Sequence, residues 1–154
     1  MPASGLSGVL KLIHVVFAVV WVGGAAFLAL YGLRLARADI AARIAFARQG
    51  LVAGRIFAAA GMVTLLAGVW LVLRENLWGF DQAWVIIGLA GIALGTILGP
   101  AFYGPQARAV IAELEGGSPT AGPRFRRIGL VSTLEAAFLL VVVWAMVYKP
   151  GGPF

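Results

Sequence analysis

The 154-residue sequence contains no cysteine, one histidine and few charged residues. The absence of cysteine excludes disulfides, thiolate metal sites, iron–sulfur clusters and cysteine nucleophiles. Since His14 is the only histidine, a site with two imidazoles would require two subunits. Charged residues make up 12% of the chain and hydrophobic residues 62%, against about 25% and about 45–50% in a typical soluble domain. This composition nearly excludes a soluble globular domain, and it excludes disorder, which requires low hydrophobicity and high charge.

Four long apolar segments predict membrane-spanning helices. A helix rises about 1.5 Å per residue, so about 20 apolar residues cross a hydrocarbon core of about 30 Å. Backbone amides in lipid must be satisfied within the segment, and these continuous apolar runs lack the alternation of barrel strands. We therefore expect an all-α, antiparallel four-helix membrane bundle that forms one domain over residues 1–154. The helices are expected at about 9–33, 56–73, 83–103 and 128–148.

The positive charges predict the orientation of the helices. Most of the 12 Lys and Arg residues lie in the two long connections, and cytoplasmic loops carry such an excess. We expect these connections in the cytoplasm and both termini outside a bacterial inner membrane. Because the arginines lie between apolar segments, the expected partner is the lipid bilayer and not nucleic acid. The connections hold Arg34, Arg37, Arg43, Arg48, Arg55, Arg108, Arg124, Arg126 and Arg127, and the opposite side holds Lys11, Arg74 and Lys149.

Both long connections are expected to be partly helical. In the first, apolar residues recur at helical spacing over 40–51, while Asp39 and Arg43 lie four apart on another face. This pattern is typical of a continuation of the first helix past the membrane, or of an interfacial helix. In the second, residues 106–115 predict a helix that ends at Gly116 and Gly117.

His14 is the first candidate functional residue, because an ionisable side chain inside a span is costly. It lies about 7 Å below the start of the first span, and Trp21 follows seven residues later on the same face. Met146 in the fourth span is expected near the same depth, so His14 and Met146 could together ligate a haem iron or copper. The alternatives are a neutral imidazole that hydrogen-bonds a neighbouring helix, and a methionine that only packs.

Glu135 is the second candidate, about 10 Å from the cytoplasmic end of the fourth span. An isolated carboxylate there is protonated or paired, and Arg55 or Arg34 could reach it. The pair would be a structural clamp, or Glu135 would be a proton or cation site. Its depth differs from that of His14 by roughly 12 Å, so we expect no contact between the two side chains except through a bridging water or ligand.

Glycines at helical spacing mark the third span. They predict close helix packing, either within the bundle or between subunits. The dipeptide Gly99-Pro100 predicts a kink near the cytoplasmic end of this span. The stripe consists of Gly88, Gly91, Gly95 and Gly99.

Several short motifs occur together in this chain. They are His14-x6-Trp21-x-Gly23-Gly24, Gly54-Arg55-Ile-Phe, Trp78-Gly-Phe, Gly-Pro at 99–100 and 104–105, Ser132-Thr-Leu-Glu135 and Lys149-Pro150. In order and spacing they resemble, over nearly the whole chain, a bacterial family of integral membrane proteins of unknown function, which implies the fold but no activity. Through the first motif alone the chain also resembles copper-resistance D-type proteins and the membrane-bound protoporphyrinogen oxidase. That resemblance implies copper or haem chemistry, carried here by His14.

The sequence leaves three functional hypotheses. Phosphate-binding loops, His-Glu-x-x-His helices, carboxylate clusters and nucleophile triads are not evident, so no catalytic residue is assigned. The leading hypothesis is an accessory or oligomerising membrane-bundle protein, working as a homo-oligomer or in a larger membrane complex. The second is a membrane redox protein that binds haem b or copper through His14, with Met146 or a second subunit's His14. The third is a small proton or ion transporter that uses Glu135.

Overall fold

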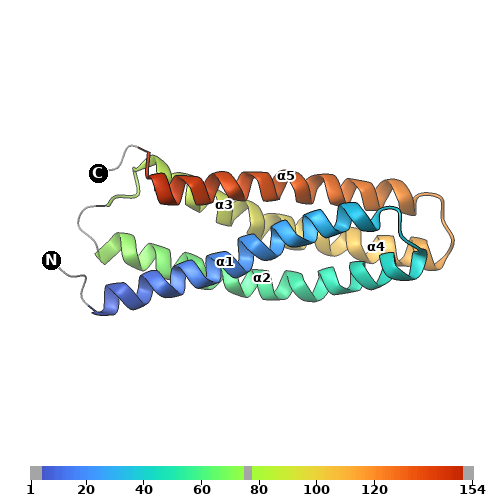
Figure 1. The fold of residues 1–154 in the computed structure, drawn as a ribbon, viewed down its shortest axis with the longest axis horizontal. Helices are drawn as coiled ribbons and strands as arrows, with labels where there is room; N and C mark the ends of the chain where they lie inside the picture. The colour runs from blue at the N-terminus through green and yellow to red at the C-terminus, as the bar shows by residue number, and fades with distance from the viewer. Residues whose placement is uncertain (1–4, 75–77, 151–154) are drawn as a thin grey trace.

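The computed structural model describes residues 5–74 and 78–150 and consists of long helices that run side by side (Figure 1). Four helical stretches are long and apolar enough to cross a membrane: Gly5–Leu35, Ile40–Arg74, Ala83–Glu115 and Ala121–Tyr148. This confirms the predicted all-α four-helix bundle. The elements are α1 (Gly5–Leu35), α2 (Ile40–Arg74), α3 (Ala83–Leu98), the π-helical turn η1 (Gly99–Tyr103), α4 (Gly104–Glu115) and α5 (Ala121–Tyr148).

The stretches alternate in direction, so the bundle has two distinct ends (Figure 1). The start of α1, the end of α2, the start of α3 and the end of α5 lie at one end, which we call the aromatic end. Its ring contacts are Trp78 with Trp84 at 5.5 Å and Trp144 with Tyr148 at 5.6 Å. The other end holds the α1–α2 and α4–α5 turns, and we call it the arginine end.

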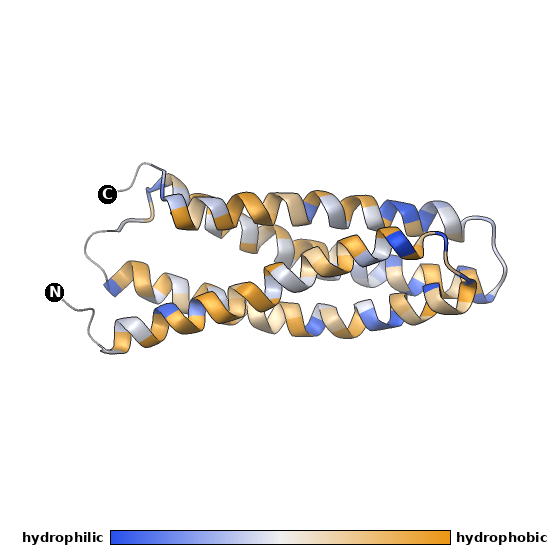
Figure 2. Ribbon diagram, viewed as in Figure 1, coloured by the Kyte–Doolittle hydropathy of each residue, from blue (hydrophilic) through white to orange (hydrophobic). Residues whose placement is uncertain are grey.

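The surface of the bundle is apolar over most of its length. Large side chains point outward, among them Val147 with 80%, Leu73 with 69% and Leu30 with 66% of their surface exposed. Figure 2 shows hydrophobic residues along the helices and hydrophilic ones concentrated toward the arginine end. A soluble monomer rarely exposes such extensive apolar patches, whereas lipid covers them in a membrane. The chain is therefore a multi-pass membrane protein.

The helix boundaries at the arginine end differ from those predicted. The first connection is neither an extension of α1 nor a separate interfacial helix, because residues 40–51 form the first turns of α2. Asp39 accepts a hydrogen bond from the Ala42 backbone N–H at 2.7 Å, so it is the N-cap of α2. Arg43 instead lies over the Phe125 ring, 4.9 Å from its centroid. Burial of the apolar face of 40–51 keeps it in the bundle, in a cluster of Ala47, Val110, Leu114, Ala121 and Phe125.

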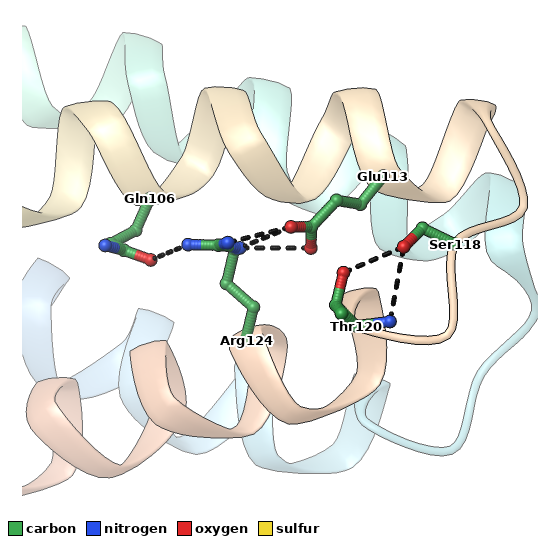
Figure 3. A network of polar contacts seen from close by, with 5 residues as sticks. All are labelled: Gln106, Glu113, Ser118, Thr120 and Arg124. Atoms are coloured by element: carbon green, nitrogen blue, oxygen red, sulfur yellow. Dashed lines mark hydrogen bonds and ion pairs between the residues drawn. The ribbon is translucent and has the colours of Figure 1, made fainter.

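The helix predicted in the second connection is confirmed by α4. It ends at Glu115, and Gly117 follows with a positive φ of 69°. Arg124 at the start of α5 joins it back to α4 (Figure 3), with its Nη1 2.7 Å from Gln106 Oε1 and its Nε 2.9 Å from Glu113 Oε1. A solvent-accessible network of this kind adds little to the stability of the fold. It nevertheless sets how α4 and α5 meet.

Three of the four glycines in the third span lie against side chains of the same chain. A Cβ at Gly91 would be 2.8 Å from Val142 Cγ2, and one at Gly95 would be 2.7 Å from Trp21 Cζ2. At Gly88 the space is occupied by Met146 Cε, whereas a Cβ at Gly99 would meet no atom within 4 Å. Gly88 and Gly91 thus allow α3 to approach α5 closely, and Gly95 makes room for the Trp21 side chain of α1.

We expect Gly95→Ala to lower the free energy of unfolding by about 1–3 kcal/mol, because the added methyl group overpacks the contact with Trp21. The matched control is Gly99→Ala, whose methyl group meets open space and whose helix propensity improves. Thermal midpoints of both variants in mild detergent provide the measurement. Equal midpoints would show that Gly95 is not a close-packing position.

Candidate functional site

A partly open cavity of about 410 Å³ lies at the aromatic end among α1, α2, α3 and α5. Its wall is mostly apolar, and its ionisable residues are Lys11, His14 and Lys149. An apolar cavity with a few placed polar groups is typical of a small-molecule site. The residues that carry the argument below are Lys11, His14, Trp78, Trp84, Met146 and Lys149.

The His14 imidazole is held by a hydrogen bond between helices. Its Nδ1 lies 2.8 Å from the backbone carbonyl oxygen of Thr64 in α2. A carbonyl only accepts hydrogen bonds, so Nδ1 must carry the proton and donate it. In the neutral ring Nε2 then has a free lone pair. A backbone carbonyl on the other ring nitrogen is a common way to orient a metal-ligating histidine.

A glycine makes room for the His14 ring. A Cβ on Gly68 would lie 2.9 Å from Cε1 and 3.0 Å from Nδ1 of the imidazole. Both distances are closer than van der Waals contact allows, so any larger residue at this position would displace the ring. Gly68 is one turn beyond Thr64 on α2, and the two residues together determine where the imidazole lies.

Met146 lines the same cavity from α5, so the structure brings both predicted donor residues to one site. Its methyl group lies where a Cβ on Gly88 of α3 would be, just as the His14 ring lies against Gly68 of α2. The cavity therefore offers one imidazole nitrogen and one thioether sulfur. Trp21, the third predicted cofactor residue, is buried with Val22, Ala60 and Leu139 and is not among the cavity-lining residues.

Two lysines and two tryptophans line the cavity toward the aromatic end of the bundle. We call these four residues the Lys–Trp rim, and this part of the cavity its mouth. Lys11 Nζ is 5.4 Å and Lys149 Nζ is 4.2 Å from the Trp78 ring centroid. Lys149 Nζ is also 5.4 Å from the centroid of Trp84. These are cation–π distances, so the indole rings help to hold both ammonium groups at the mouth.

The second candidate, Glu135, has a different partner from those expected. Its Oε2 accepts a hydrogen bond from the Tyr103 hydroxyl at 2.6 Å. Within the described part of the chain, no ion pair joins Glu135 to Arg55 or Arg34. The expected arginine clamp is therefore replaced by a tyrosine, and Arg55 lies exposed on α2.

The π-helical turn explains why Tyr103 meets Glu135. It begins at Gly99-Pro100, where a kink was predicted, and the Gly104 N–H bonds to the carbonyl of Gly99. The wider turn rotates the residues after it relative to a regular helix. Glu135 Oε1 would also lie 3.6 Å from a Cβ on Gly95, next to Trp21. Glu135 is not among the cavity-lining residues, in agreement with its predicted separation from His14.

Sequence reasoning missed Thr64, Gly68, Tyr103 and the role of the two lysines. Lys11 carries a signal, because it precedes the predicted donor His14 by three residues on the same helix. Lys149 follows Met146 by three residues, just past the end of α5. Thr64 contributes only its backbone carbonyl, which no side-chain pattern reveals. Tyr103 lies in the π-helical turn, which the sequence reasoning did not predict.

The donor set fits haem better than a bare copper ion. Among residues 5–74 and 78–150 there is no group of three or more His, Asp or Glu that could hold a metal ion. His14 and Met146 provide two protein donors, whereas protein copper sites commonly use three or more. Haem brings its own four nitrogen ligands and needs only one or two from the protein. The apolar wall and tryptophan rings also suit a flat, hydrophobic macrocycle.

Comparison of the chain with protein-family models, with curated proteins and with solved structures finds no match. The site must therefore be interpreted from its own chemistry.

We expect Tyr103→Phe to lower the free energy of unfolding by about 1–2 kcal/mol, because the Glu135 carboxyl loses its hydrogen-bond donor inside the bundle. Tyr148→Phe, at an exposed position, removes the same hydroxyl without this loss. Thermal midpoints in detergent compare the two. If Tyr103→Phe matches Tyr148→Phe, the bond does not stabilise the bundle.

Proposed function

We propose that this chain is a haem-binding membrane protein whose cavity at the aromatic end holds the haem through His14. The observation that carries the proposal is the hydrogen bond from His14 Nδ1 to the Thr64 carbonyl beside a cavity of about 410 Å³. It leaves Nε2 as the basic nitrogen of the neutral ring, in the tautomer that an axial ligand requires. Haem bound here would supply one-electron redox chemistry.

The residues around the cavity have separate tasks in this proposal. Thr64 and Gly68 fix the tautomer and the position of the His14 ring. Met146 of α5 could provide a second ligand to the haem iron, and its thioether would favour the reduced state. The apolar wall excludes water from the metal and so affects its reduction potential. The charge distribution supports a location of this cavity in the outer leaflet of a bacterial inner membrane.

The test is a haemin titration of the purified protein in neutral detergent. The wild type is expected to give a stoichiometric Soret band, and His14→Asn is expected to lose it. Asparagine keeps an N–H that can donate to the Thr64 carbonyl but has no second ring nitrogen, so the fold is retained while the ligand is removed. An unchanged thermal midpoint of His14→Asn checks this. Met146→Leu should change the band position if sulfur is the second ligand.

A colourless wild-type protein after titration would overturn the proposal. The hypothesis of an accessory or oligomerising membrane protein would then be the better explanation of the fold. A Soret band that survives in His14→Asn would show instead that haem binds elsewhere or without this residue.

A second variant changes the position of His14 but not its identity. Gly68→Ala places a methyl group against Cε1 and Nδ1 of the ring, and we expect haem affinity to fall about 10–100-fold, as for other changes to the partners of a metal ligand. Gly54→Ala on the same helix is the control, because its Cβ would meet no atom within 4 Å. Equal affinities of the two variants would contradict the positioning role of Gly68.

A further inference from the structure

The polar groups of the cavity form two layers along the membrane normal. On α1, Lys11 precedes His14 by three residues, and just past the end of α5, Lys149 follows Met146 by three. Residues three apart lie on the same face of a helix and differ by about 4.5 Å in depth. Since α1 and α5 run in opposite directions, both lysines lie nearer the end of the bundle, and both donor residues lie one turn deeper.

The lysine layer is formed by specific contacts. Both ammonium groups lie over the Trp78 ring, at 5.4 Å for Lys11 and 4.2 Å for Lys149. The Trp84 indole below Lys149 is itself fixed, because its Nε1–H donates to Gln82 Oε1 at 2.8 Å and its side chain is buried. The positive charges are thus concentrated at the mouth of an otherwise apolar cavity.

The backbone at Lys149 ends α5 in a left-handed conformation. With φ 48° and ψ 59°, Lys149 is the one non-glycine residue with a positive φ in the described part of the chain. This left-handed conformation is unfavourable for a lysine and is normally taken by glycine or asparagine at a helix end. The Lys149 N–H still bonds to the Ala145 carbonyl at 2.8 Å. Strained residues of this kind cluster at ligand-binding sites.

We infer that the Lys–Trp rim binds the carboxylates of an amphiphile whose apolar body fills the cavity. The two ammonium groups donate charge-assisted hydrogen bonds to the carboxylate oxygens, and the indole rings cover the first part of the apolar body. For the haem of the proposed function, on which this part of the inference rests, the carboxylates are the two propionates. A fatty acid from the bilayer presents the same chemistry.

The experiment compares each acid with its methyl ester, which has the same apolar body but no negative charge. Haemin and haemin dimethyl ester are titrated by their Soret bands, against wild type and the double variant Lys11→Gln with Lys149→Gln. The wild type is expected to bind the diacid at least about 10-fold more tightly than the diester, as two charge-assisted bonds imply. The double variant is expected to bind both forms equally. The control, Arg74→Gln, removes one exposed cation at the same end that does not line the cavity, and should keep the preference.

A second titration tests carboxylate binding by the Lys–Trp rim independently of haem binding. Dibrominated stearate and its methyl ester quench tryptophan fluorescence, and this readout needs no haem. Haem binding without an acid preference, together with equal quenching by both stearates, would overturn the inference and leave the haem proposal standing. An acid preference for stearate that depends on both lysines, in a protein that binds no haem, would support the rim and overturn the haem proposal. Thermal midpoints equal to wild type establish that the lysine variant is folded.

Discussion

Where two helices of this bundle meet at a glycine, a side chain of one helix occupies the space of the missing Cβ on the other. The His14 ring occupies this space at Gly68, the methyl group of Met146 occupies it at Gly88, and the indole ring of Trp21 occupies it at Gly95. Lipid is as apolar as the protein interior, so the hydrophobic effect does not draw helices together, and close packing takes its place. The same contacts that hold the helices also set the position of the candidate donors.

Polar bonds between helices add to this packing. His14 links α1 to α2 through the Thr64 carbonyl, and Tyr103 links η1 to Glu135 on α5. In membrane bundles such bonds are worth about 0.6–2 kcal/mol each, because the separated helices find other partners. Their main effect is to fix orientation. The His14 bond selects one tautomer, and this selection makes a ligand role chemically reasonable.

Hydropathy predicted the spans but not the ends of the helices. It reports which segments avoid water, so it located the four apolar segments. It could not show that Asp39 caps α2. Nor could it show that residues 40–51 pack against Val110 and Phe125, because an extension of the first helix, an interfacial helix and the start of α2 would all be amphipathic. Likewise, the opposite charges favoured an arginine as the partner of Glu135. In the structure the hydroxyl group of Tyr103, which lies in the π-helical turn, donates the hydrogen bond instead.

The sequence by itself determined that the protein lies in lipid, that four helices cross the membrane and that the arginines are concentrated toward one end. It also identified His14 and Glu135 as the exceptional ionisable groups inside the spans. The tertiary structure decided which groups meet: His14 and Met146 at one cavity, with Lys11 and Lys149 at its mouth and Trp21 outside it. The physical reason is that these helices are apolar on nearly every side. When lipid and protein interior are equally apolar, the pattern of hydrophobic side chains does not encode which face of a helix turns inward. Close packing at glycines and the polar bonds between helices select the rotation instead.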